Sequence, residues 1–277
     1  MPKIAVLVTM SLAACAQAPD ASLQFEVASI KAAPPPDPRG WTMRYHGGPG
    51  TEDPSLFTCE NWGLSGLITL AYNIQDYELS GPDWMGSTRF MISAKVPAGA
   101  TWEQFRVMLQ NLLAERFKLT LHHEKREMEA YELALAKNGS KLKESVPPPE
   151  DPDAPPPPPA DLSKKDENGF PVLPPGRQAA MVVTGSHAAQ RFAQVSMDIF
   201  VRQLAGQLRR PVIDATELKG KYDFTLRWIT EGSPSATDEG PNIFRALQEQ
   251  LGLKLESKKG MVDVMVVDHV EKTPTEN

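Results

Sequence analysis

The sequence repeats one order of elements along its length. Segments 57–137 and 191–270 each predict a short strand, a helix, one or two strands, a second helix and a closing pair of strands. Apolar residues in the first predicted helix recur at a constant offset: Leu64, Leu67, Ile68 and Ala71 in one segment, and Met197, Phe200, Val201 and Leu204 in the other. The repeat predicts an α+β fold of two similar small units, each strand-helix-strand-strand-helix-strand-strand, and by itself identifies no activity.

Proline separates the two predicted units. The chain has 26 prolines, and the runs at 147–149 and 155–159 favour an extended polyproline II conformation over a packed core. The predicted organisation is a signal-peptide and lipobox region at 1–18, a first α+β unit with an N-terminal strand and loop at 22–137, a Pro-rich linker at 138–178, a second α+β unit at 179–271 and a tail at 272–277.

Local patterns sharpen the prediction for the amino-terminal unit. Alternating residues at 25–30 predict a strand, and the sequence leaves open which sheet this strand joins. Cys59 falls in an expected strand at 57–61, where a small buried side chain is expected. Thr101 and Gln104 have the spacing of a capping box and predict the start of a helix.

Three further segments are predicted from their composition. Residues 75–79 are expected to form a short strand. The charged run at 124–129 predicts a turn or a strand extension between two strands. Near the carboxyl end, Lys258, Lys259 and Gly260 are expected at the tip of a closing hairpin.

The amino terminus has the pattern of an export signal. Lys3 precedes a short apolar run at 4–12, which is shorter than the ~20 residues that span a bilayer. Leu12, Ala13, Ala14 and Cys15 then resemble a bacterial lipobox, in which the cysteine is diacylated and holds the protein to the membrane. The alternative is cleavage after Ala18, which would give a periplasmic or secreted protein. Both alternatives predict a location outside the cytoplasm.

The net charge limits the classes of partner that we expect, and the cysteine content limits the possible disulfides. With 35 acidic and 29 basic residues the net charge is -6, which argues against a general nucleic-acid binder. The two cysteines are Cys15 and Cys59. If Cys15 is acylated or removed, Cys59 has no partner for an internal disulfide.

Four motifs carry a resemblance to a known family: FEVASIK at 25–31, AERFKL at 114–119, GKYDFTL at 220–226 and LQEQLGLKL at 247–255. Together they resemble the acidobacterial family of exported proteins with domain of unknown function 3738, over nearly the whole mature chain. The resemblance implies no established activity. Some relatives are fused to, or encoded beside, membrane metallopeptidases, but the chain lacks their His-Glu-x-x-His motif. The order of elements in each half also resembles the short N-terminal domain of secretins and TonB-dependent receptors, which implies protein docking, often by addition of a strand to a sheet edge.

Catalytic and metal-binding patterns are weak in this sequence. The five histidines are scattered, and the adjacent His122 and His123 should point to opposite faces of a strand, so we predict neither a metal site nor a cofactor. Ser186 and His187 are expected in a polar turn, without a Gly-x-Ser-x-Gly elbow. Turn-forming or capping roles are expected for three aspartates near strand ends, Asp76, Asp83 and Asp214.

Aromatic residues offer a candidate binding face. Trp62 and Trp84 border the first predicted helix, and Tyr77 lies between them in the sequence. Core packing is the simpler expectation for these side chains, but a partly exposed set would mark a binding surface. The sequence thus predicts an exported, lipid-anchored, non-enzymatic envelope protein that docks a protein or peptide partner. The alternatives are an envelope hydrolase with a site between the two units and a small-molecule sensor domain.

Overall fold

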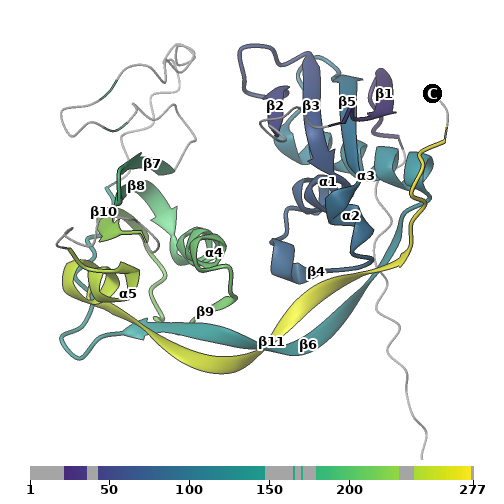
Figure 1. Ribbon diagram of the computed structural model, residues 1–277. Coiled ribbons are helices and arrows are strands. Elements are labelled where there is room, and N and C mark those ends of the chain that lie inside the picture. The colour runs from purple at the N-terminus through teal and green to yellow at the C-terminus, as the bar shows by residue number, and fades with distance from the viewer. Residues whose placement is uncertain are drawn as a thin grey trace, which may run out of the picture. The chain divides into compact units, whose positions relative to one another are not determined.

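The computed structural model describes residues 22–35, 43–146, 165, 170, 179–230 and 240–275 (Figure 1). The predicted signal region with Cys15, and most of the predicted Pro-rich linker, lie outside these residues. The predicted α+β class is confirmed, because helices and sheets alternate along the chain. The chain forms two compact units, of which unit 1 comprises Met1–Glu124 and Asp263–Asn277, and unit 2 comprises Lys125–Val262.

Unit 1 is built on a four-stranded antiparallel sheet. Its strands are, in spatial order, β1 (Val27–Ala32), β5 (Arg89–Lys95), β3 (Leu56–Gly63) and β2 (Arg44–Gly47). The strand expected near 25–30 is therefore β1, and it joins the first sheet. The first sheet packs against α1 (Leu64–Tyr72) and α3 (Trp102–Phe117), whose buried faces complete the core.

The core of unit 1 is rich in phenylalanine. Phe57 and Phe105 pack edge to face with ring centroids 4.8 Å apart, and Phe90 and Phe117 do so at 5.0 Å. The capping box predicted for α3 is confirmed: the Gln104 amide donates to Thr101 Oγ1 at 3.3 Å, while the Thr101 amide donates to Gln104 Oε1 at 2.9 Å. These bonds satisfy amide groups that the first turn of a helix leaves without partners.

A short segment follows α1 and folds differently from the prediction. The strand expected at 75–79 is wrong for most of its length: a 3-10 turn, η1 (Asp76–Glu78), precedes a two-residue strand, β4 (Leu79–Ser80). The reason is local, because the Gln75 amide donates to Glu78 Oε2 at 2.7 Å and closes a turn. The helical turn α2 (Trp84–Ser87) then leads into β5.

Unit 2 has a three-stranded antiparallel sheet in the order β10 (Lys221–Ile229), β8 (His187–Ser196) and β7 (Ala179–Thr184). Helix α4 (Met197–Leu208) packs against this sheet. The remaining elements of the unit are β9 (Val212–Asp214), α5 (Ile243–Ala246) and the π-helical turn η2 (Leu247–Leu251).

Two long strands continue from one unit into the other. They are β6 (Thr120–Leu135) and β11 (Leu253–His269), drawn teal and yellow in Figure 1, and they are hydrogen-bonded neighbours. Of the two alternatives at 124–129, the strand extension is confirmed, because β6 runs through this segment. The hairpin tip expected at 258–260 is wrong, because β11 continues through it. The charges are tolerated because they pair across the two strands, as in the Lys259–Glu127 ion pair at 3.0 Å and the Lys258–Glu132 pair.

Short strands join this pair in parallel within each unit. In unit 1, Leu79 and Ser80 of β4 pair with Met265 and Val266 of β11. In unit 2, β9 pairs with β6 from Tyr131 to Leu133. Both units thus contain the order strand, helix, short strand, strand, helix, long strand. The internal duplication itself stays a prediction.

Candidate functional site

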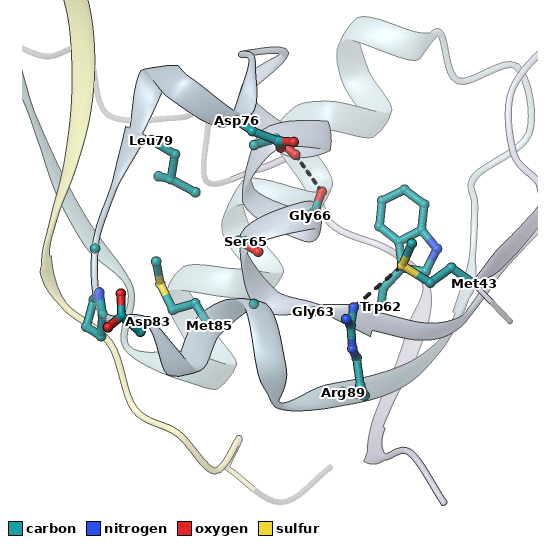
Figure 2. A pocket seen from close by; sticks show the side chains of 14 residues that line it. Met43, Trp62, Gly63, Ser65, Gly66, Asp76, Leu79, Asp83, Met85 and Arg89 are labelled. Carbon is teal, nitrogen blue, oxygen red and sulfur yellow. Dashed lines mark hydrogen bonds between the residues drawn. The ribbon is translucent and has the colours of Figure 1, made fainter. Parts of the chain in front are cut away.

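Unit 1 has a pocket of about 570 Å³ between α1 and the segment that runs from η1 to β5. Its apolar lining comes from Met43, Trp62, Leu79, Pro82 and Met85. Figure 2 shows Met43, Trp62, Leu79 and Met85 around the amino-terminal half of α1. This volume is within the range of ligand pockets in proteins, about 300–1,000 Å³.

A β-bulge directs Trp62 toward this pocket. Cys59 pairs with Ile92 but Trp62, three residues on, pairs with Phe90, so β3 contains one extra residue at this point. Asn61 adopts the left-handed conformation with φ 58° in the bulge. The extra residue places Trp62 opposite the buried Phe90. Its indole lies against Gly66 of α1, where an added Cβ would be 3.3 Å from Trp62 Cε3.

Charged side chains of both signs line the pocket. Figure 2 shows Arg89 on one side, near Met43 and Trp62, and Asp83 on the opposite side, near Met85. Asp76, at the start of η1, is a third charged lining residue. Arg89 Nη1 donates to Met43 Sδ at 3.5 Å, which is a weak bond. Within the described ranges, the carboxylates of Asp76 and Asp83 have no hydrogen-bond or ion-pair partner.

The three aromatic residues predicted as a binding face have different surroundings. Trp62 lines the pocket, and its Nε1 is buried without an acceptor among the described residues. Tyr77 is partly buried in η1 and Trp84, the first residue of α2, packs against the core of unit 1. Tyr77 and Trp84 are not lining residues of this pocket, and the binding role of all three stays a prediction.

The second candidate site is the free edge of β7 in unit 2. β7 is the last strand of its sheet, and no other strand in the described part of the chain pairs with its outer side. Its sequence, AAMVVT, contains no charged residue and no proline. Met181 and Val183 are 37% and 54% exposed, and they share a face with the buried Gln190 and Ala188 of β8.

Helix α4 runs beside this exposed face. Gln207 Nε2 contacts Met181 Sδ at 3.2 Å, and Gln203 accepts a hydrogen bond from the amide of Gln190. On the opposite face, Val182 and Thr184 border a hollow of about 310 Å³. A strand added to β7 would therefore find apolar side chains on one face and a hollow on the other.

The opposite edge of the same sheet is protected. The Gln250 side chain bonds both backbone groups of Arg227 in β10, at 3.0 and 2.7 Å. Segment 144–145 pairs with the start of β10 through the Ser145 amide and Lys221 oxygen, 2.7 Å apart. Charged residues occur in the edge strands β1 and β2. Among the described edge strands of three residues or more, β7 alone has no charge.

The residues considered for catalysis have structural partners. His122 Nδ1 lies 2.7 Å from Asp268 Oδ1 and His123 Nδ1 lies 3.0 Å from Asp263 Oδ1, so the two imidazoles contact different carboxylates. Asp214 Oδ1 accepts from the amide and hydroxyl of Thr216, which confirms its predicted turn role. Asp83 lies in the turn at the N-cap position of α2, where its backbone oxygen accepts from the Gly86 amide at 3.3 Å and its side chain makes no cap bond.

The described residues form neither a metal-binding cluster nor a membrane-spanning helix. No group of three or more His, Cys, Asp or Glu side chains in the ranges given above could hold a metal ion. No helix formed by those residues is long and apolar enough to cross a membrane.

Sequence reasoning missed two parts of these sites. No motif in the sequence marks Arg89, and its place in the pocket depends on tertiary packing. The uncharged composition of β7 can be seen in the sequence, but its position at the edge of a sheet cannot. Such information depends on which strands pair, and pairing is a long-range property.

Comparison with known proteins gives one match. The family model described as "Protein of unknown function (DUF3738)" matches residues 65–270, and the chain therefore belongs to this family. No curated protein and no solved structure matches the chain.

Proposed function

We propose that this member of the DUF3738 family is an exported, lipid-anchored protein of the bacterial envelope that works by binding a protein or peptide partner, without catalysis. The observation that carries the proposal is the unprotected edge of β7. Edge strands in natural proteins are usually blunted by charge, proline or a bulge, because a free edge pairs with other chains. β7 has none of these features over Ala179–Thr184.

The mode of binding that we propose is strand addition. An extended segment of the partner would pair with the outer backbone groups of β7 and lay alternate side chains over Met181 and Val183. Burying such side chains contributes about 25 cal/mol per Å² of apolar surface. An uncharged segment with alternating apolar residues fits this surface best.

The lipid anchor would hold the protein at the membrane, where it would meet its partner. The lipobox at 12–15 would place two acyl chains on Cys15, and two chains are enough for stable membrane attachment. If cleavage instead follows Ala18, the same binding surface works in a periplasmic or secreted protein. The mass of the mature amino-terminal peptide separates these two forms.

The proposal predicts that one charge on β7 abolishes partner capture. We expect Val183→Lys to reduce crosslinking to the partner about tenfold or more, because strand addition would bury the ammonium group. The matched control is Met261→Lys, since Met261 is also an exposed apolar strand residue, 62% exposed, but lies on β11. The measurement is chemical crosslinking with mass spectrometry in the native envelope.

Wild type, Cys15→Ser and both lysine variants are compared in that experiment. Support requires crosslinks that map to β7, persist in Met261→Lys and are lost in Val183→Lys at unchanged melting temperature. Loss of the same crosslinks in Cys15→Ser would show that anchoring brings the partners together. Equal capture by both lysine variants would refute strand addition at β7.

A further inference from the structure

The pocket in unit 1 has features that the β7 edge does not explain. It lies wholly within unit 1, and its lining combines one cationic side chain, two anionic ones and an apolar middle. The ion pairs elsewhere, such as Lys95–Glu26 at 2.6 Å, show that opposite charges in this chain do meet when the fold brings them together. In the pocket they remain apart.

Each end of the pocket keeps unused hydrogen-bonding capacity. Arg89 has five N–H donors, and its bond at the pocket is to a thioether sulfur, which is a weak acceptor. On the opposite side, beside Met85, Asp83 offers carboxylate oxygens that no described residue occupies, and Asp76 offers others near Gly66 of α1 (Figure 2). Charged groups in a cleft that lack protein partners are available for a ligand.

Trp62, which lines the same pocket, has a buried donor. Its Nε1 has no acceptor in the part of the chain that the structure describes, although buried indole N–H groups normally have one. The ring is also fixed in place, with Gly66 on one side and Tyr45 packed edge to face at 5.7 Å. The fixed ring thus gives the pocket a rigid aromatic wall.

Two glycines lie where the segments that form the pocket walls approach one another closely. An added Cβ on Gly63 would be 2.9 Å from the Met85 carbonyl, and one on Gly81 would be 2.4 Å from the Met85 methyl group. The end of β3 and α2 are therefore packed at a spacing that favours glycine at position 63, and Gly81 lies directly against the Met85 side chain. The pocket is thus part of the fold of unit 1.

We propose that this pocket binds a short peptide with a free amino group and a free carboxylate. The carboxylate would pair with Arg89, the ammonium group with Asp83 on the opposite side, and the side chains would lie against Trp62, Met85 and Leu79. A fully anionic ligand would leave both aspartates facing negative charge, and a cationic one would repel Arg89. The zwitterion satisfies both ends, and the site is independent of β7.

The test uses the dipeptide leucyl-alanine and the full chain. Isothermal titration should show binding, and the peptide should raise the melting temperature. N-acetyl-leucyl-alanine lacks the ammonium group and leucyl-alanine amide lacks the carboxylate. Each capped form should bind about tenfold more weakly or worse, because each loses a charge-assisted bond.

Charge variants of the pocket test which residue binds each end of the peptide. Arg89→Gln should weaken leucyl-alanine about tenfold but leave the amide unchanged, since the amide has no carboxylate to lose. Asp83→Asn should weaken leucyl-alanine and leave the acetylated form unchanged. Arg44→Gln, an exposed arginine on β2 outside the pocket, should change nothing.

The outcomes are decisive in either direction. Matched losses between capped peptides and charge variants, at unchanged melting temperature of the free proteins, support the proposal. Absence of leucyl-alanine binding to the wild type overturns it, as does binding that the charge variants do not alter. Val183→Lys must retain peptide binding, so failure at this pocket and failure at β7 are told apart.

Discussion

The thiol of Cys59 is sealed within the core of unit 1, where it is 1% exposed. Burial, with a smaller contribution from the neighbouring Glu60 carboxylate, raises the pKa of the thiol from 9.0 to about 12. Both effects disfavour the thiolate, which is the reactive form. The expectation from the sequence that Cys59 is a small buried side chain is confirmed.

Cys59 should therefore be inert in the folded protein. At pH 8 a thiol with this pKa is ionised in roughly one molecule in ten thousand, so a thiol reagent should label it only after unfolding. The measurement is labelling of the Cys15→Ser variant with Ellman's reagent, with and without denaturant. Labelling at the same rate in both conditions would contradict the buried position.

Two glycine-to-alanine substitutions should separate the destabilisation caused by a left-handed backbone from that caused by steric overlap. Gly252 ends η2 with φ 68°, and an added Cβ would be 2.1 Å from the Gly139 carbonyl oxygen. Gly99 has a similar φ of 77° with nothing within 4 Å of the added atom. Gly99→Ala should thus cost only the left-handed conformation, about 1–2 kcal/mol of unfolding free energy.

Gly252→Ala should cost that amount and at least about 1–3 kcal/mol more, because a backbone segment must shift. Urea unfolding of both variants beside wild type measures the difference. Equal losses would mean that segment 139–141 moves away from η2 without cost.

Among the secondary-structure elements, the helices with regularly spaced apolar residues were predicted well from the sequence. Helices α1, α3 and α4 were expected from apolar spacing, and the capping box located the start of α3. Strands β6 and β11 were predicted in pieces, because a charged run in an exposed strand looks like a turn. What the sequence could not show is that Glu127 would have Lys259 opposite it.

In the predicted linker, too, composition did not reveal tertiary contacts. Composition predicts a solvated spacer at 138–178, yet its described parts contact unit 2. The Lys141 amide donates to the Leu251 oxygen at 2.9 Å, and Phe170 is 2% exposed with Arg227 over its ring at 6.0 Å. One aromatic residue in a proline-rich stretch carries too little pattern to predict such a contact. The β3 bulge that positions Trp62 is equally invisible, since the sequence does not mark the extra residue.

At the scale of the molecule, unit 1 is assembled from both ends of the chain. Residues 263–277 supply the strand that pairs with β4, and Val267 and Val270 pack against the core of unit 1. The Glu271 amide also donates to the Phe117 oxygen at 2.7 Å. The amino-terminal segment up to Leu135 therefore lacks part of its own unit.

A chain that ends at Val262 should consequently have a destabilised unit 1. Each apolar side chain that loses its burial costs about 1–3 kcal/mol, so the combined loss is a large share of the 5–15 kcal/mol typical of a protein. Limited proteolysis with mass spectrometry should show cleavage within 22–124 at protease levels that leave the full chain intact.

The control for this truncation is deletion of residues 276 and 277 alone, which should change nothing. A synthetic peptide of residues 263–277 should restore protection of the truncated chain. Equal protease resistance of the truncated and full chains would show that unit 1 is complete without its carboxyl-terminal part.

The pairing of Leu79 with Met265 also determines when unit 1 can be completed during synthesis of the chain. A ribosome makes a chain from its amino end, so Leu79 must wait until 186 further residues have been added before its partner exists. Unit 1 is begun first and finished last. During that interval its incomplete sheet and apolar surfaces are open to chaperones and proteases.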